Sequence, residues 1–133
     1  MAWRAAVSLR SPLGRVLGAG SARAGTAHWW AQRVSAVALI PLTLWFFWSL
    51  LLLPTLDYTT VHTWLSVPLS AFLAVLLVAV TAYHSYLGTN VVVEDYVHAH
   101  SAKLFLLLLL RFLYVLCGGA GIFAILRIAL LNP

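Results

Sequence analysis

Charged residues are scarce in this 133-residue chain: they make up 8% of it, and only three are acidic. Soluble domains carry about 25% charged residues, so the composition excludes an ordinary water-soluble fold. Hydrophobic residues make up 63% of the chain, and the mean hydropathy is +0.98. Lipid must surround most of the chain, and three spans of about 20 residues would leave little room for an extramembrane catalytic domain.

Cysteine is almost absent, and the single Cys117 excludes an intrachain disulfide. Because it lies in the last apolar run, we interpret it as a small packing residue. The net charge of +5 could indicate nucleic acid, but five arginines precede the first apolar run. That placement is typical of membrane topology and contact with lipid head groups, so we expect membrane lipid and no nucleic acid as a partner.

Residues 1–27 form an Arg-rich tail with no acidic residue and no apolar stretch of signal-peptide length. We interpret it as a tail on the cytoplasmic or matrix side. A cleaved mitochondrial presequence has a similar composition and stays open as an alternative. Residues 28–133 are interpreted as a three-helix membrane anchor domain.

Three apolar segments have the length that a bilayer requires. We predict spans at about 34–53, 65–88 and 104–127, with a kink at Pro41 in the first. Polar connectors are predicted at 55–63 and at 89–103. The predicted fold class is an all-α membrane protein with three transmembrane helices.

The positive charges predict the orientation, since Lys and Arg near span ends accumulate on the cytoplasmic side. The tail, counted through Arg33, has five cations, the first connector none, the second Lys103, and the C-terminal end Arg127. We therefore predict a cytoplasmic or matrix-side N-terminus, an inner second connector and a C-terminus on the periplasmic or intermembrane side.

His84 lies inside the second predicted span, four residues before its end. At 1.5 Å per residue this is about 6 to 10 Å from the inner membrane surface. Ionisable residues at such depth are costly and usually functional, and neutral imidazole is a common axial ligand of haem iron. Gly88, one turn onward, would let a flat macrocycle or a neighbouring helix approach. A structural histidine in an interhelical hydrogen bond is the alternative.

A six-coordinate haem needs a second strong ligand, and no other histidine offers one at this depth. His28 and His62 lie on opposite sides of the membrane in the predicted topology, while His98 and His100 lie in the inner connector. Such a haem would have to lie between this chain and another. We interpret His98 and His100 as part of a solvated or interfacial loop rather than a metal site.

The segment Glu94, Asp95 and Tyr96 follows the second predicted span on the inner side. Reduction of a quinone takes two electrons and two protons, so its site needs a hydroxyl donor and a carboxylate or water path for protons. Tyr96 and Asp95 offer these groups. On spacing alone, an interfacial tyrosine beside two solvated acids is the alternative.

Two arginines and a group of glycines complete the candidates. Arg33 begins the first span at the same depth, where it fits a haem propionate, the quinone region or an ordinary topological anchor. Arg111, about 12 Å into the third span, is better explained by snorkelling or by an ion pair with a partner. Gly118, Gly119 and Gly121 are suited to close helix packing rather than to phosphate binding.

Gly88 lies four residues after His84, and the pair Asp95 and Tyr96 ends twelve residues after it. This spacing resembles the signature of the small hydrophobic membrane anchor (D) of succinate dehydrogenase, respiratory complex II. The segment 28–36, HWWAQRVSA, is also similar to the start of the first anchor helix in alphaproteobacteria. The resemblance covers about residues 25–127.

The resemblance implies half of a six-helix anchor bundle, completed by a second anchor subunit (C), with one haem b between the two. An iron-sulfur subunit (B) would dock on the inner face, with a flavoprotein subunit (A) beyond it. Succinate would be oxidised at FAD in the flavoprotein, and ubiquinone would be reduced where the iron-sulfur subunit meets the anchors. This chain would be a non-flavin subunit without a succinate site, in the bacterial or mitochondrial inner membrane.

Carried over by position, His84 would be an axial ligand of the haem iron and Tyr96 would donate a hydrogen bond to a ubiquinone carbonyl. Asp95 would take part in proton delivery, and Arg33 would contact a propionate or the quinone region. Two alternatives stay open. One is an anchor of fumarate reductase, which runs in the opposite direction, and the other is a non-redox membrane protein, such as a transporter component or assembly factor, without haem.

Overall fold

The computed structural model describes residues 22–131, and all regular structure in that range is α-helical. The helices are α2 (Ala22–Leu51), α3 (Tyr58–Ser66), α4 (Pro68–Tyr96) and α5 (His100–Leu130). Three segments in it are long and apolar enough to cross a membrane, namely Thr26–Leu51, Pro68–Tyr96 and His100–Leu130. The predicted all-α class with three spans is confirmed, while most of the predicted tail, residues 1–21, lies outside the described residues.

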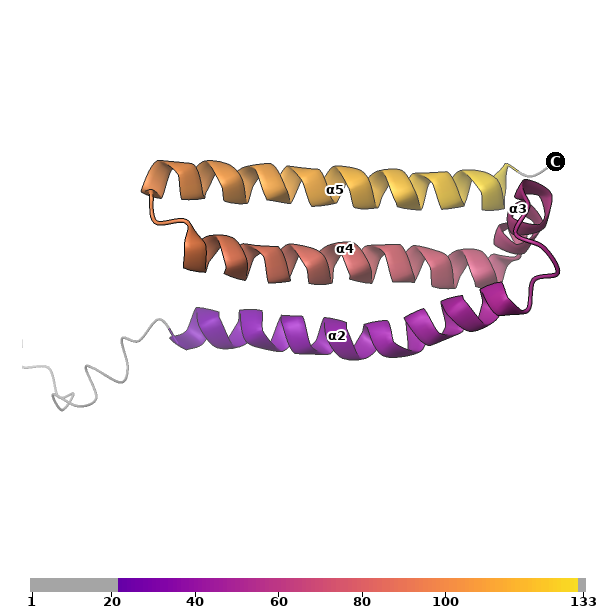
Figure 1. The fold of residues 1–133 in the computed structure, drawn as a ribbon, viewed down its shortest axis with the longest axis horizontal. Helices are drawn as coiled ribbons and strands as arrows, with labels where there is room; N and C mark the ends of the chain where they lie inside the picture. The colour runs from indigo at the N-terminus through magenta and orange to yellow at the C-terminus, as the bar shows by residue number, and fades with distance from the viewer. Residues whose placement is uncertain (1–21, 132–133) are drawn as a thin grey trace, which may run out of the picture.

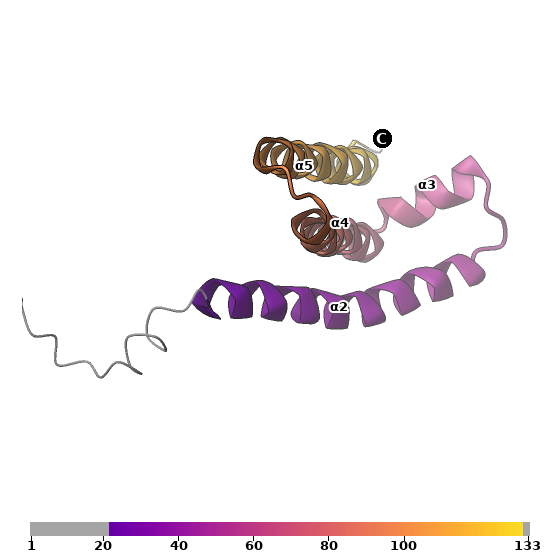
Figure 2. The ribbon, with the colours of Figure 1, turned by 60° about the vertical axis from the view of Figure 1, so that its left-hand side comes forward.

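The three long helices form a layer with α4 in the middle (Figure 1). Helix α4 packs against both α2 and α5, whereas the backbones of α2 and α5 do not approach each other closely. Helix α2 crosses α4 at a clear angle (Figure 2). The start of α2, the end of α4 and the start of α5 share one end of the layer, which we call the turn end because the α4–α5 turn, 97–99, lies there. Helix α3 lies at the other end, the α3 end.

Helix α4 continues through most of the segment predicted as the second connector. The prediction of a polar connector at 89–103 is wrong, because only 97–99 is not helical. No proline or glycine follows Gly88 in this segment, and Thr89 donates its hydroxyl proton to the Ser85 carbonyl at 2.7 Å. At the turn, Lys103 Nζ donates to the Glu94 carbonyl at 2.9 Å, which satisfies a helix-end acceptor. Polar composition here marks the edge of the apolar stretch and not the end of the helix.

The first connector also contains a helix that was not predicted, α3. Asp57 is its N-cap and accepts a hydrogen bond from the Thr60 backbone N–H at 2.7 Å, and Thr55 donates to the same carboxylate at 3.0 Å. These hydrogen bonds, led by that of the Thr60 backbone, hold the pKa of Asp57 below its usual 3.8. Pro68 then begins α4, a position at which proline has no hydrogen bond to lose.

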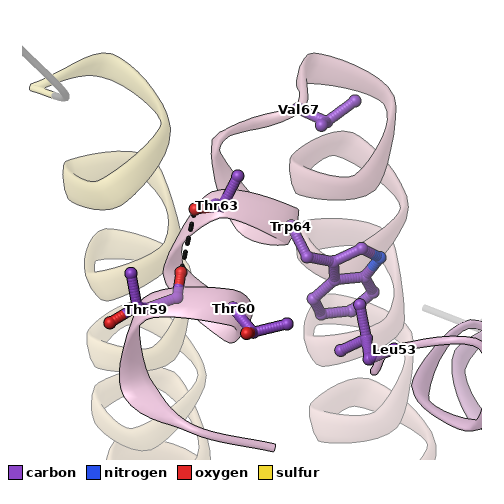
Figure 3. A pocket seen from close by; sticks show the side chains of 6 residues that line it. All are labelled: Leu53, Thr59, Thr60, Thr63, Trp64 and Val67. Atoms are coloured by element: carbon purple, nitrogen blue, oxygen red, sulfur yellow. Dashed lines mark hydrogen bonds between the residues drawn. The ribbon is translucent and has the colours of Figure 1, made fainter. Parts of the chain in front are cut away.

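Aromatic rings attach α3 to the end of α2. Trp64 of α3 stacks on Trp45 of α2, with ring centroids 5.8 Å apart. A shallow pocket of about 380 Å³ lies beside Trp64, lined by Leu53, Thr59, Thr60, Thr63, Trp64 and Val67 (Figure 3). It contains no ionisable group, and the Thr63 hydroxyl donates within α3 to the Thr59 carbonyl at 2.9 Å. This pocket therefore belongs to the packing of α3.

Close packing of α4 on α5 depends on two glycines. A Cβ atom at Gly118 would lie 3.1 Å from the Ala82 Cβ, and one at Gly121 would lie 3.1 Å from Val78 Cγ1. A Cβ atom at Gly119 would meet nothing within 4 Å. Gly118 and Gly121 take part in the predicted close packing, whereas Gly119 lies on another face of α5 and meets no other helix of the described chain.

Proline does not interrupt the first long helix. Helix α2 is unbroken through Pro41 and curves along its length (Figure 2). A proline inside a helix removes one backbone hydrogen bond and so favours bending. The predicted kink is therefore present only as curvature within one continuous helix.

Candidate functional site

His84 lies in α4 and makes its side-chain contacts with α2. Its Nδ1 atom is 2.9 Å from Ser35 Oγ, and its Nε2 atom is 3.4 Å from the Gln32 side-chain nitrogen. Gln32 and Ser35 are three residues apart on a helix and therefore share one face. Ser35 is 6% exposed and is the one buried polar residue in the described part of the chain.

The hydroxyl proton of Ser35 determines which tautomer of His84 fits. Ser35 Oγ donates to the Gln32 backbone carbonyl at 3.0 Å. A serine hydroxyl has a single proton, and with that proton on the carbonyl the Ser35 oxygen can accept a proton from His84 Nδ1. The Nε2 atom then carries the free electron pair and faces the Gln32 amide. A neutral imidazole of this tautomer is suited to bind a metal through Nε2.

The position of His84 along α4 differs from the prediction. The helix ends at Tyr96, twelve residues after His84, which corresponds to about 18 Å of helix. The whole helix of 29 residues is about 43 Å long, against about 30 Å for a hydrocarbon core. His84 is thus close to the middle of α4, which continues for eight residues past the predicted end of the second span at residue 88.

An open groove of about 460 Å³ runs beside His84. Its lining comes from all three long helices: Gln32, His84, Ser85, Gly88, Thr89, Val92 and Tyr114. Gly88 lines the groove, where a Cβ atom would make an ordinary van der Waals contact of 3.4 Å with the Gln32 side-chain nitrogen. Thr89 gives its hydroxyl proton to the Ser85 carbonyl and therefore accepts one from the Tyr114 hydroxyl at 2.9 Å.

The residues around His84 fit an iron ligand. The Gln32 side-chain oxygen is buried and has no hydrogen-bond partner within residues 22–131, and its nitrogen has only the long contact of 3.4 Å with Nε2. Such a weakly held amide can turn away, whereas Nδ1 stays fixed by Ser35. No group of three or more His, Cys, Asp or Glu side chains able to hold a metal ion occurs in the described range. A haem iron takes at most two ligands from protein, so the absence of such a group bears on bare metal ions and not on haem.

The candidate quinone residues end α4 at the turn end. Asp95 and Tyr96 are both exposed, Tyr96 to 79%, and no hydrogen bond joins them to His84 or Arg33 in the described part of the chain. Along α4 they are about 16 to 18 Å from His84. The structure therefore keeps the candidate iron ligand and the candidate quinone residues on one helix but at different depths.

The two candidate arginines do not contact His84. Arg33 is exposed, and its guanidinium lies 5.1 Å from the centroid of the Trp29 ring. Gln32 and Ser35 contact His84, so the neighbouring Arg33 lies close to the level of that histidine. The Arg33 side chain projects from another face of α2. Arg111 is exposed on α5 and lines a separate pocket of about 390 Å³ with Tyr83, Tyr86 and Tyr114.

The remaining histidines are separate from His84. No described hydrogen bond links it to His28, His62, His98 or His100. His98 is exposed in the α4–α5 turn, and His100 is exposed at the first residue of α5. These histidines were predicted to lie away from His84, and their positions agree with that prediction.

Sequence reasoning missed Gln32 and Ser35 as partners of His84. Both lie within the HWWAQRVSA segment, but they carry no signal of their own beyond polar character at a spacing of three residues on an apolar helix. That spacing indicates a shared polar face directed away from lipid. It does not indicate which residue of another helix lies opposite.

Comparison with known proteins gives the family of the chain. Residues 8–118 match the family described as succinate dehydrogenase/fumarate reductase transmembrane subunit. This matched range begins and ends earlier along the chain than residues 25–127, the range over which the sequence resembles the anchor subunits. No solved structure gives a significant match to the chain.

Several individual proteins are similar over most of their length, and each is named succinate dehydrogenase hydrophobic membrane anchor subunit. The protein from Paracoccus denitrificans is 31% identical over 113 residues, 85% of this chain and 87% of its own. Those from Rickettsia bellii and Rickettsia typhi are 28% and 29% identical, over 87% and 79% of this chain and 93% and 84% of their own. The resemblance seen in the sequence is confirmed, and the chain belongs to the family of succinate dehydrogenase/fumarate reductase transmembrane subunits.

Proposed function

We propose that this chain is the hydrophobic membrane anchor of a succinate:ubiquinone oxidoreductase and that His84 binds the iron of haem b through Nε2. The observation that carries the proposal is the contact of Ser35 with Nδ1, which leaves the electron pair of Nε2 free beside a weakly held amide. Similarity to proteins named as anchor subunits supports the same function.

A second anchor subunit would supply the other ligand to the iron, since His98 and His100 of this chain lie at the turn end, more than twelve residues along the chain from His84. Bound there, haem b accepts and returns single electrons within the membrane. The turn end receives the iron-sulfur subunit, and the flavoprotein with FAD lies beyond it. Succinate is oxidised in the flavoprotein, and this chain has no succinate site.

Tyr96 and Asp95 form this chain's part of the ubiquinone site. The Tyr96 hydroxyl donates to a quinone carbonyl, and the Asp95 carboxylate passes protons from water. Their exposure at the turn end supports this role, because a quinone bound there would meet both side chains at the contact with the iron-sulfur subunit.

Arg33 contacts a haem propionate or the quinone region. Its position near the level of His84 and its exposed guanidinium support a contact with an anionic group from outside the chain. The stacking on Trp29 holds the guanidinium near the surface of α2.

The turn end faces the bacterial cytoplasm or the mitochondrial matrix, and the C-terminus faces the opposite side of the inner membrane. The positive charges before α2 and Lys103 beside the turn support this orientation. The family includes fumarate reductase subunits, and the direction of succinate oxidation rests on the names of the similar anchor subunits.

The test is a reduced-minus-oxidised absorbance spectrum of the purified complex, before and after His84→Ala. We expect a b-type spectrum in the parent complex and its loss in the variant, with flavin and iron-sulfur content unchanged. His98→Ala is the matched control and should keep the spectrum, because His98 is exposed in the turn. An undiminished b-type spectrum in the assembled His84→Ala complex would overturn the proposal and favour a non-redox role for His84.

A further inference from the structure

Ser35 is in an unusual place for a serine on a membrane helix. It is buried, and it contacts the imidazole of His84 on a second helix at 2.9 Å. The other α2 hydroxyl with a described hydrogen bond within the span, that of Thr43, bonds only within its own helix, to the Leu39 carbonyl at 2.6 Å and the Ile40 carbonyl at 3.1 Å. An apolar residue could pack against α4 without the cost of burying a hydroxyl. The hydroxyl of Ser35 therefore has a role in the state of His84.

We propose that Ser35 is a positioning residue that keeps the proton of His84 on Nδ1 and raises the electron-donating strength of Nε2 toward haem iron. The inference rests on the proposed function and extends it to a residue on another helix. Ser35 itself would not touch the iron or the macrocycle, since its oxygen faces Nδ1, on the opposite side of the ring from Nε2.

The hydrogen bonds determine the direction of this effect. Ser35 gives its proton to the Gln32 carbonyl, so its oxygen accepts the Nδ1 proton. An acceptor at Nδ1–H draws that proton partly away from the ring and makes Nε2 a stronger donor. A stronger donor stabilises ferric over ferrous iron and lowers the reduction potential.

Gln32 fits the same arrangement from the other nitrogen. Its amide nitrogen lies 3.4 Å from Nε2, and its buried oxygen has no partner among the described residues. Nε2 therefore has only a weak competitor for its electron pair, whereas Nδ1 has a strong partner. Ligation by Nε2 disturbs one long contact and leaves the Ser35 bond in place.

The expected effect of Ser35→Ala is a higher reduction potential of haem b in the purified complex. Changes to residues that hold a metal-ligating histidine alter metal affinity or activity by about 10-fold to 100-fold. We expect the lower end of that range, a roughly tenfold shift in the ferric-to-ferrous ratio at a fixed ambient potential, which is about 59 mV for one electron. Potentiometric titration of the b-type absorbance measures it.

Two variants separate a hydrogen bond from helix packing. Ser35→Thr keeps the hydroxyl and should keep a potential close to that of the parent. Thr43→Ala removes a hydroxyl from the same helix without a contact to His84, and it should leave the potential unchanged. Loss of haem from Ser35→Ala alone, with haem retained in both controls, would also support positioning by the hydroxyl.

The results that overturn the inference differ from those that overturn the proposed function. A b-type spectrum that persists in the His84→Ala complex would overturn the proposed function itself. If His84→Ala loses the spectrum but Ser35→Ala has the potential of the parent, only the role of Ser35 is wrong. Equal shifts in Ser35→Ala and Thr43→Ala, or loss of haem from both Ser35 variants, would assign Ser35 to packing and overturn the inference as well.

Discussion

At the scale of single residues, Tyr96 is 79% exposed although it ends a long apolar helix. A phenol at the edge of a membrane is common as an anchor, but here it adjoins the exposed carboxylates of Asp95 and Glu94. A hydroxyl donor beside a carboxylate offers both a hydrogen bond and a proton supply. The role of the Tyr96 hydroxyl can therefore be tested by a substitution that keeps the aromatic ring.

Tyr96→Phe should lower ubiquinone reduction by succinate roughly 100-fold, because it removes the proposed donor to the quinone carbonyl. Succinate oxidation with an artificial electron acceptor should stay near the parental rate, since electrons then bypass the quinone. Steady-state rates of the purified complex with each acceptor measure both.

Tyr58→Phe is the matched control for Tyr96→Phe, because Tyr58 is similarly exposed, to 81%, but lies at the α3 end. It should change neither rate. An equal loss of both activities in Tyr96→Phe would point to failed assembly, and an unchanged quinone rate would remove Tyr96 from the quinone site.

The candidate site residues stand out in the sequence, and the side chains that contact them do not. His84, Asp95 and Tyr96 were identified because each is a polar group at an informative place in an apolar chain. Ser35 and Gln32 lie 49 and 52 residues from His84 in sequence. Their contact depends on how α2 crosses α4, which a pattern within either helix does not determine.

At the scale of helices, the packing of α4 on α5 depends on Gly118. Gly118→Leu should weaken it, because a Cβ atom there already lies 3.1 Å from the short, inflexible Ala82 Cβ. The cost of overpacking is about 1 to 3 kcal/mol. The thermal dissociation midpoint of the purified complex should fall accordingly.

Gly119→Leu is the control for that substitution, since a Cβ atom at Gly119 meets nothing within 4 Å inside the chain. It should leave the midpoint within the error of the parent unless a partner subunit covers that face. A fall for Gly119→Leu that equals or exceeds that for Gly118→Leu would contradict the described α4–α5 contact.

The start of α3 should respond to acid through Asp57. The pKa of this N-cap is lowered in the folded chain by hydrogen bonds from Thr60 and Thr55, so its ionised form stabilises the helix. That stabilisation is complete above the unfolded pKa of about 4 and is lost as pH falls through the folded value below 3.8. Hydrogen exchange of the α3 amides, corrected for intrinsic rates, should show falling protection over that range.

Asp57→Asn should remove the acid dependence at Asp57, because asparagine caps a helix but does not titrate. The protection of the α3 amides in the parent, divided by their protection in Asp57→Asn, should therefore decline as the pH falls below about 4. A ratio that is constant with pH would show that the carboxylate does not stabilise α3.

The existence of the three long helices was predictable, but their ends were not. Apolar length identified each span. The helix ends differ because α4 retains helical hydrogen bonds through residues 89–96, which include five polar residues, and because Asp57 caps α3 within the predicted first connector. Hydropathy reports the boundary with lipid, while capping and the absence of breakers decide where a helix stops.

At the scale of the whole molecule, the three long helices form an incomplete structure. They lie in one layer with α4 in the middle (Figure 1), and large apolar side chains such as Phe47, Phe72 and Phe112 are exposed on all three. Lipid can cover such surfaces, and so can another subunit. The open groove beside His84 also lacks a wall from this chain.

Purification through an affinity tag on this chain should therefore recover three further proteins in mild detergent. We expect a flavoprotein, an iron-sulfur protein and a second small hydrophobic subunit, in equal amounts with the anchor. Mass spectrometry and quantification of bound flavin and iron measure this composition. Recovery of the chain alone, or with unrelated membrane proteins, would contradict its place in such a complex.

The central claim is that His84 supplies one ligand to the iron of a haem and that another chain supplies the second. The most direct measurement is the low-temperature electron paramagnetic resonance spectrum of the oxidised, purified complex, compared between the parent and His84→Met. We predict a low-spin signal of six-coordinate haem in the parent, and its shift or loss in the variant with iron-sulfur content unchanged. The same low-spin signal in both complexes would contradict the account.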